Sequence, residues 1–280
     1  MTAVQTELAF EPLSDAIGVE VKGLDLSTPL DEATVEALKD VWYDRCLLLF
    51  RDQDISNADQ ERFARYFGEL EDVRTGEIAR SDMPYTMLIT NVRDTGMKTA
   101  LEDGEMWFHY DQCYYEIPAR ASALYAMEVP RVGGNTLFAN CFLAWETLPE
   151  DLRQKLDGLK AHQIYDYHGN PTKRGENIAA DAPQYLHPIA RTHPETGRKA
   201  LYVNRLMTDY IEGMSREESD EILEKLFRHS EDPRFIYEHE WRVGDLLLWD
   251  NRSSMHARTY FAPDDRRMMR RITVKGEPVI

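Results

Sequence analysis

The sequence predicts a mixed α/β fold, mainly β, in which a double-stranded β-helix (jelly roll) carries helical insertions. Many short segments rich in branched and aromatic residues lie between turns, as in all-β barrels and sandwiches. A few amphipathic stretches with helix-start signals interrupt them. The 280 residues, 42% of them hydrophobic, suffice for one core, so a single domain over residues 1–280 is expected.

Three helices are expected from their start and stop signals. Residues 31–44 place apolar side chains on one side of a helix. Ser56 begins a second helix, for which Gly68 is the stop, and Ser215 begins a third that runs to about His229. Strands are expected at residues 46–50, 85–90, 121–129, 136–139, 235–241, 245–249 and 271–275.

The net charge and the cysteine content indicate which binding partners and which cellular compartment to expect. A formal net charge of −17 opposes binding to nucleic acids and anionic membranes, so the expected partner is a small molecule. The number of cysteines is odd, and their spacing is not that of a zinc finger: Cys46, Cys113 and Cys141. This pattern indicates reduced thiols in the cytoplasm. The first residues lack a secretory pattern, and no apolar run is long enough to span a membrane. A homo-oligomer, a dimer or larger, is the expected state.

His109, Asp111 and His256 have the residue types of a metal site. Two neutral imidazoles and one carboxylate bind a divalent metal on one face and leave other positions open, as in non-haem iron(II) oxygenases. In an extended segment His109 and Asp111 project to the same side and Tyr110 to the other. His256 follows the apolar run 246–249, which is typical of a buried strand that ends in a turn. An H-x-D triplet arises often by chance, so alone it indicates little.

The order of motifs along the chain is more specific than the triplet. G-G-N-T occupies residues 133–136, W-D-N-R residues 249–252, and R-R-M-M-R-R residues 266–271. With the two histidines and the aspartate, this ordered set resembles the iron(II)/2-oxoglutarate-dependent dioxygenases of the taurine dioxygenase and 2,4-dichlorophenoxyacetate dioxygenase family. The resemblance extends over nearly the whole chain, from G-V-E-V-K-G-L-D-L near Gly18 to the C-terminal arginines.

The resemblance implies a role for each motif. It implies that the triad ligates iron(II) and that Thr136 and Arg267 hold the distal carboxylate of 2-oxoglutarate, with dioxygen as the other cosubstrate. Arg271 matches a second arginine that faces the same pocket and meets an anionic substrate; the cosubstrate and a structural carboxylate are its alternative partners. The implied reaction hydroxylates an unactivated C–H bond and releases succinate and carbon dioxide. Its substrate would be a small anionic compound, such as a sulfonate, an aryloxyalkanoate or another carboxylic acid.

Elementary chemistry supports the arginine roles. A guanidinium is always charged, and its planar fork matches a carboxylate. On a strand Arg267, Met269 and Arg271 share one face while Met268 and Arg270 share the other, so one strand aims two cations inward. The alternative is a basic, solvated edge strand.

Several segments near the triad are candidates for shaping its pocket. Phe108, Tyr110 and Cys113 are neighbours of the ligands in the sequence and are candidate lining residues, although a place in the core is the alternative for the aromatic pair. Residues 93–105 and 166–184 are polar and broken by glycine or proline. Each is a candidate lid, with an ordinary connection as the alternative.

Departures from the family pattern bear on the substrate. Many members have tryptophan before the first histidine and a small residue before the aspartate, where this chain has Phe108 and Tyr110. The histidine and tyrosine that bind taurine in the family have no match in the segment that starts at Glu71. Taurine itself is therefore not expected as the substrate.

Two other functions compete with that of an oxygenase. Two histidines and a carboxylate also bind zinc in hydrolases, but Thr136 and Arg267 would then have no role. A non-catalytic carboxylate-binding protein on the same scaffold would be expected to lack a metal ligand, and none is missing. The other histidines show no ligand spacing and are expected to be structural or solvated: His162, His168, His187, His193, His229 and His239.

Overall fold

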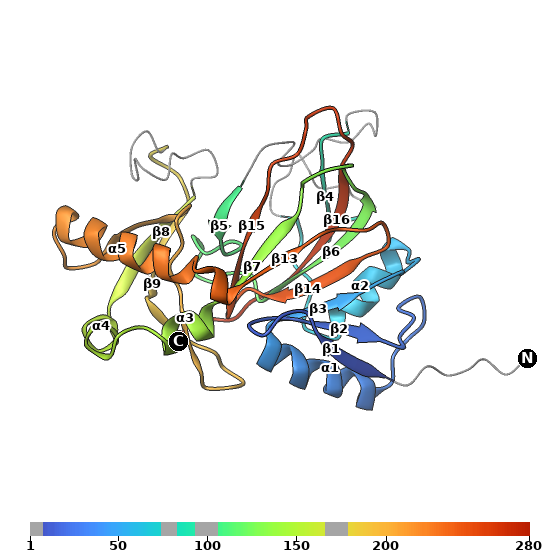
Figure 1. The fold of residues 1–280 in the computed structure, drawn as a ribbon, viewed down its shortest axis with the longest axis horizontal. Coiled ribbons are helices and arrows are strands. Elements are labelled where there is room, and N and C mark those ends of the chain that lie inside the picture. The colour runs from blue at the N-terminus through green and yellow to red at the C-terminus, as the bar shows by residue number, and fades with distance from the viewer. Residues whose placement is uncertain (1–7, 74–82, 93–105, 166–178) are drawn as a thin grey trace, which may run out of the picture.

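Two β-sheets that share one apolar core form the centre of the molecule (Figure 1). The computed structural model describes residues 8–73, 83–92, 106–165 and 179–280. The larger sheet has seven strands in the order β1 (Ala9–Pro12), β2 (Val19–Lys22), β3 (Leu47–Phe50), β14 (Leu246–Asp250), β6 (Ala121–Glu128), β16 (Met268–Val274) and β4 (Thr86–Thr90). Strands β2 and β3 run parallel, and the other neighbours in this sheet are antiparallel.

The second sheet lies against the inner face of the first. Its order is β13 (Ile236–His239), β7 (Thr136–Asn140), β15 (Ser254–Arg258) and β5 (Met106–His109), all antiparallel. Apolar side chains from both sheets, among them Phe138, Leu247 and Met269, belong to one buried cluster. This cluster is the packing that holds the two sheets together.

Helices α1 (Glu32–Arg45) and α2 (Asn57–Arg65) cover the outer face of the larger sheet. Leu246 and Leu248 pack with these helices, whereas Leu247 and Trp249 face the core between the sheets. A strand that is buried on both faces needs a continuous apolar run instead of an alternating one, which explains the L-L-L-W sequence.

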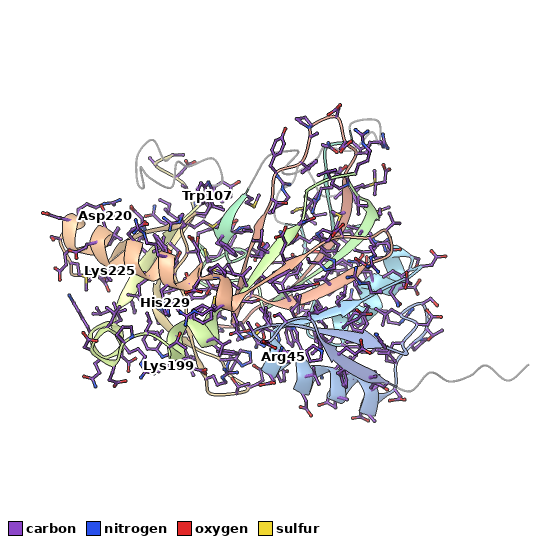
Figure 2. All side chains as sticks on the ribbon, viewed as in Figure 1. Arg45, Trp107, Lys199, Asp220, Lys225 and His229 are labelled. Atoms are coloured by element: carbon purple, nitrogen blue, oxygen red, sulfur yellow. The ribbon has the colours of Figure 1, made fainter. Side chains whose placement is uncertain are left out.

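A third apolar cluster lies in a separate group of elements, at the left of Figure 1. The group consists of α3 (Cys141–Glu146), α4 (Glu150–Leu156), α5 (Arg216–Ser230), the 3-10 turn η1 (Pro233–Phe235), a sheet ordered β12 (Thr208–Ile211), β8 (Lys160–Ile164), β9 (Gln184–Pro188), and the pair β10 (Ala190–Thr192) and β11 (Lys199–Leu201). Helix α5 is amphipathic: Leu223 and Leu226 are buried, while Asp220 and Lys225 lie on its outer surface (Figure 2).

The structure confirms a mixed α/β fold that is mainly β, with the expected helices in place. Helix α1 begins after Asp31, whose side chain accepts a hydrogen bond from the Thr34 amide, and Ser56 forms a capping box with Asp59. Ser215 caps α5 in the same way through its side-chain oxygen. Strand β16 begins three residues before the predicted 271–275. Among the described residues, no helix combines the length and apolarity required to span a lipid bilayer.

The two candidate lids lie wholly or partly outside the residues that the structure describes. The candidate lid at residues 93–105 lies outside the described residues, as does 166–178 of the other candidate, which contains His168.

Candidate functional site

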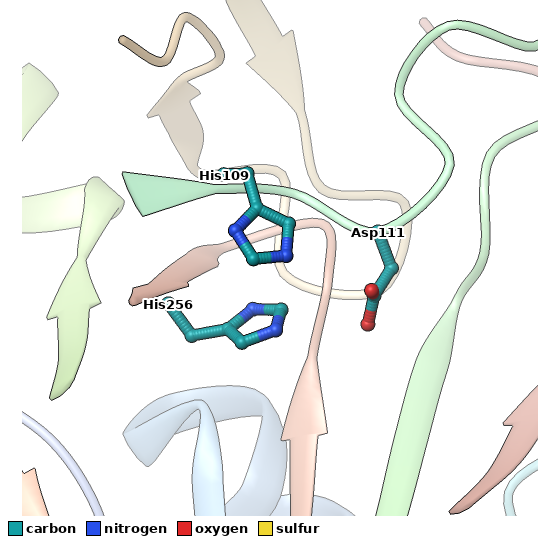
Figure 3. Close-up of side chains that lie close together, drawn as sticks. All are labelled: His109, Asp111 and His256. Carbon is teal, nitrogen blue, oxygen red and sulfur yellow. The ribbon is translucent and has the colours of Figure 1, made fainter. Parts of the chain in front are cut away.

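The structure brings His109, Asp111 and His256 together between the two sheets. One nitrogen or oxygen atom of each lies within 4.8 Å of the others. The two imidazoles face each other with ring centroids 4.2 Å apart, and the Asp111 carboxylate lies beside them (Figure 3). His109 in β5 is the direct cross-strand partner of His256 in β15, so sheet register sets the distance between the histidines.

Asp111 reaches the site by a route that differs from the expected one. The sequence predicted an extended H-x-D segment, but β5 ends at His109 and Asp111 lies in the turn that follows. Gln112, the next residue, has a left-handed φ of 59°, and its amide group donates to the Glu71 carboxylate at 2.6 Å. The turn, instead of strand alternation, therefore aims the carboxylate at the histidines.

Both imidazoles are held in the neutral form that binds metals. The carbonyl oxygen of Trp107 lies 2.9 Å from Nδ1 of His109. A carbonyl can only accept, so Nδ1 carries the proton and the lone pair of Nε2 is left for a metal. Burial lowers the pKa of His109, and burial together with the neighbouring His109 lowers the pKa of His256 to about 3.

Asp111 is an ionised carboxylate in spite of its burial. Burial alone would raise its pKa, but Arg271, the two neighbouring histidines and the hydrogen bond from Ser122 together outweigh that effect and hold the pKa of Asp111 well below its usual range. Nη2 of Arg271 lies 2.9 Å from Oδ1 of Asp111, with a geometry that makes an ion pair but not a well-aligned hydrogen bond. Ser122 Oγ donates to Oδ2 at 2.7 Å.

A cavity opens beside the triad, and cationic and apolar side chains share its wall. The lining residues are Ile89, Met106, His109, Leu124, Thr136, Trp249, His256, Arg258, Arg267 and Arg271. Three arginines thus reach one cavity in a chain whose net charge is strongly negative. This local concentration of cations favours an anionic ligand.

Three residues expected to line the pocket are absent from the wall of this cavity. Tyr110 points away from the triad, is fully buried and donates to the Leu201 carbonyl. Cys113 is buried against Gln163, and Phe108 packs against the core cluster. The pocket-lining expectation for Phe108, Tyr110 and Cys113 is therefore not met in this cavity: Phe108 is next to His109 in β5 and faces the other side of the strand, and Tyr110 and Cys113 are buried in the core.

Arg267 is a buried cation without a carboxylate partner in the described part of the chain. Its side chain is 3% exposed, and its Nε has no hydrogen-bond acceptor. Burial and the like charge of Arg258 lower its pKa to about 9. Such a cation is costly until an anion neutralises it.

Thr136 and the G-G-N-T turn lie next to this arginine. Thr136 Oγ1 accepts a hydrogen bond from Trp241 Nε1 at 3.0 Å, which leaves its hydroxyl proton available to a ligand. Gly133 has a φ of 75°, and a Cβ there would lie 2.2 Å from the Tyr260 carbonyl oxygen. Only glycine fits there, so the turn packs closely against the Tyr260 backbone, and the next residue, Gly134, lies beside the Arg267 side chain.

Arg271 and Arg270 confirm the alternation expected for the last strand. Arg271 faces the cavity, whereas Arg270 faces α2 and donates to Gln60 Oε1 at 2.6 Å. The substrate, the cosubstrate and a structural carboxylate were the candidate partners of Arg271, and Asp111 is such a carboxylate. Its buried Nε has no hydrogen-bond acceptor within the part of the chain that the structure describes and can donate to a ligand.

Sequence reasoning missed Arg258 and the apolar wall. Arg258 lies two residues after His256 on β15, so the two-residue strand period would have placed it on the same face. It is the cross-strand neighbour of Thr136 and of Met106. Leu124 enters the wall as the neighbour of Arg271 in β6, which only the sheet register reveals.

Comparisons with known proteins agree with this geometry. The model of the family described as "Taurine catabolism dioxygenase TauD, TfdA family" matches residues 9–273. The chain is 33% identical to a pentalenolactone F synthase of Streptomyces avermitilis, over 94% of this chain and 92% of the relative. It is also 33% identical to an (S)-phenoxypropionate/alpha-ketoglutarate-dioxygenase of Sphingobium herbicidovorans, over 95% of this chain and 94% of the relative. The crystal structure of AAD-2 in complex with Mn(II) and N-oxalylglycine is similar with a TM-score of 0.81 and 30% identity, over 98% of this chain and 100% of that one.

Proposed function

Because the chain belongs to the TauD, TfdA family and is an alpha-ketoglutarate-dependent dioxygenase, we propose that His109, Asp111 and His256 hold its iron(II). Two neutral imidazoles and one ionised carboxylate within 4.8 Å of one another have the chemistry of such a site. Iron(II) bound there would supply the activation of dioxygen that oxidation of a C–H bond requires. Charge, orientation and exclusion of water are then the task of the protein.

We propose that Arg267 and Thr136 bind the distal carboxylate of 2-oxoglutarate (alpha-ketoglutarate). The buried guanidinium of Arg267, which has no carboxylate partner among the described residues, is the observation that carries this assignment, because a dicarboxylate would supply the missing anion. The adjacent hydroxyl of Thr136 can donate a further hydrogen bond. N-oxalylglycine, which the similar structure of AAD-2 contains, has the same two carboxylates as 2-oxoglutarate.

A zinc hydrolase and a non-catalytic carboxylate binder are weaker alternatives. The ligand set alone would also suit zinc. A zinc-bound water needs no dicarboxylate, however, so Arg267 would remain a buried cation without a partner. A carboxylate binder would not require three intact metal ligands.

The substrate proposed for this site is a small anion with an apolar or aromatic portion. Ile89, Met106 and Leu124 provide an apolar wall, and the free Nε of Arg271 provides a donor for an anionic group. By its name, the Sphingobium relative acts on (S)-phenoxypropionate, an aryloxyalkanoate with these two features. Hydroxylation of an unactivated C–H bond of such a compound is the proposed outcome, with release of succinate and carbon dioxide.

We also propose that the scaffold is a double-stranded β-helix that forms a single domain. The two central sheets share one core cluster, which supports a double-stranded β-helix, and the family match over residues 9–273 supports a single domain. A cytoplasmic location and a homo-oligomer stay predictions from the sequence. Light scattering coupled to size-exclusion chromatography tests the oligomer.

An anaerobic titration tests the proposed function. Iron(II) and 2-oxoglutarate added together should give a weak visible absorption band, and iron(II) with succinate should not, because succinate lacks the keto oxygen needed for chelation. Aerobic incubation with a panel of small aryloxy acids and sulfonates should then couple succinate formation to substrate loss. Folded protein that shows neither the band nor succinate formation with any metal preparation would contradict the proposal.

A further inference from the structure

A chain of four buried side chains runs from the cavity wall to the Asp111 carboxylate. Trp249 Nε1 donates to Asn251 Oδ1 at 3.0 Å, Asn251 Nδ2 donates to Ser122 Oγ at 3.2 Å, and Ser122 Oγ donates to Asp111 Oδ2 at 2.7 Å. None of the four side chains is more than 1% exposed. We call Trp249, Asn251 and Ser122 the relay.

The relay joins both halves of the triad. Trp249 and Ser122 are direct cross-strand partners in β14 and β6, and Asn251 is the first residue after β14. Asn251 also begins the turn that leads to His256 in β15. The centroid of the Trp249 ring lies 4.7 Å from that of the His256 ring. Trp249 therefore contacts His256 directly and is connected to Asp111 through Asn251 and Ser122.

The hydrogen-bond directions in the relay have only one consistent solution. Indole Nε1 can only donate, so the atom of Asn251 that faces Trp249 must be the oxygen. The amide nitrogen of Asn251 then donates to Ser122 Oγ. The one proton of the Ser122 hydroxyl is consequently directed to Asp111 Oδ2.

The two oxygens of Asp111 therefore have different surroundings. Oδ2 accepts the relay's terminal hydrogen bond, while Oδ1 lies 2.9 Å from Arg271 Nη2. An octahedral ion with three single-atom protein ligands keeps three positions open. If Asp111 gripped the ion with both oxygens, only two would be left.

We propose that Ser122 and Asn251 are positioning residues that make Asp111 a single-oxygen ligand, so that a third coordination position stays open. The inference rests on the proposed metal site and adds to it how the carboxylate is held. In the absence of the Ser122 proton, Oδ2 becomes free to turn toward the ion. The relay also ties Asp111 to the segment of His256, so its loss loosens the ligand set. Changes in the contacts behind a metal ligand typically reduce metal affinity about 10-fold to 100-fold.

Mn(II) provides a readout that does not depend on turnover. The relaxation enhancement of water protons per bound Mn(II) increases with the number of water molecules on the ion. Ser122→Ala should lower this enhancement by about one third, because one of about three open positions is lost. Calorimetric titration should show a Mn(II) affinity about 10-fold to 100-fold weaker than that of the wild type.

Two further variants guard against a purely structural effect. Ser230→Ala is the matched control, since Ser230 is an equally buried serine that donates to a backbone carbonyl in α5. It should leave Mn(II) affinity and relaxation unchanged. Trp249→Phe keeps an aromatic ring but removes the N–H that orients Asn251, so it should shift both quantities in the direction of Ser122→Ala. It keeps the inference testable if Ser122→Ala does not fold.

The outcomes separate this inference from the proposed function. Wild-type protein that binds no Mn(II) would contradict the metal site itself. If the wild type binds Mn(II) and folded Ser122→Ala protein shows the same relaxation per bound ion, the relay does not control how Asp111 ligates, and the inference is overturned.

Discussion

Replacement of Arg267 by methionine should weaken 2-oxoglutarate binding and stabilise the unliganded protein. The arginine is 3% exposed and lacks a carboxylate partner among the described residues. Its pKa falls from the usual 12.5 to about 9. At 1.36 kcal/mol for each tenfold change, this is a penalty of about 5 kcal/mol on the charged form. An anion that binds to Arg267 recovers much of that penalty, and methionine never incurs it.

The expected loss of affinity follows from the same burial. Loss of a buried charge-assisted pair costs about 2 to 5 kcal/mol, which corresponds to a dissociation constant about 30-fold to 5,000-fold higher for 2-oxoglutarate. Calorimetric titration of 2-oxoglutarate into the Mn(II)-loaded protein measures this change. The melting temperature of the unliganded variant should rise, because replacement of an unpaired buried ion by an apolar residue is typically neutral or stabilising.

Arg266→Met serves as the control for the Arg267 experiment. The Arg266 side chain is 54% exposed and pairs with Glu128 at the surface, so its loss should change neither quantity by more than a small factor. A dissociation constant that stays unchanged in folded Arg267→Met protein would show that a different residue holds the distal carboxylate. A lower melting temperature would show that Arg267 has an internal partner.

Three other perturbations test further parts of the structure. Asp111→Ala should abolish turnover and weaken Co(II) binding with an unchanged circular dichroism spectrum; wild-type-like succinate formation would refute its place in the metal site. Arg271→Leu at saturating 2-oxoglutarate should lower coupled substrate oxidation much more than cosubstrate decay without substrate, because the lost ion pair with Asp111 affects both rates and the lost donor affects the substrate alone; an equal fall in both rates would refute a substrate role. Asp250→Asn should lower the free energy of unfolding by about 1.5 to 3 kcal/mol at pH 7, because it removes the buried carboxylate that accepts from Arg252, while Arg252 keeps Glu195 and Glu277 as partners. Arg252 and the hydrogen bond from His193 together outweigh burial and lower the pKa of Asp250 in the folded state. The contribution of Asp250 to the free energy of unfolding is therefore complete above about pH 4 and declines below it. Urea titrations should accordingly show a smaller difference between variant and wild type in acid.

The sequence was sufficient to predict the three members of the cluster because their signals are local or ordered along the chain. His109, Asp111 and His256 were found from residue type and motif order, and the inward face of Arg267 and Arg271 followed from the strand period. The path of the chain at Asp111 was not predictable in this way. It depends on the left-handed backbone conformation of Gln112, which the sequence H-Y-D-Q does not predict.

The cavity wall could not be predicted, because register across strands decides it. Leu124 and Met106 enter the wall as cross-strand neighbours of Arg271 and Arg258. A shift of one residue in either pairing would reverse which side chains face inward. Register is a property of the assembled sheets, so no local pattern around Leu124 indicates it.

The helices with capping signals were predicted, whereas the short elements between β7 and β13 were not. Asp31, Ser56 and Ser215 each cap a helix start with a side-chain hydrogen bond. Helix α3 has six residues, too few for an amphipathic period to be recognised. Strand β9 ends in Pro188 and is only partly buried, so its composition differs from that of the core strands.

The candidate site exists only where the two central sheets meet. His109 and His256 belong to the four-stranded sheet, whereas Ser122 and Arg271, which contact opposite oxygens of Asp111, belong to the seven-stranded sheet. Asp111 therefore connects the two histidines of one sheet to Ser122 and Arg271 of the other, and the spacing between the sheets sets the relative positions of the three clustered side chains. Apolar side chains from both sheets fill a single cluster, and a close-packed core transmits strain instead of yielding smoothly. The packing of that core is thus part of the site, which is why an H-x-D triplet gains meaning only from the strands that surround it.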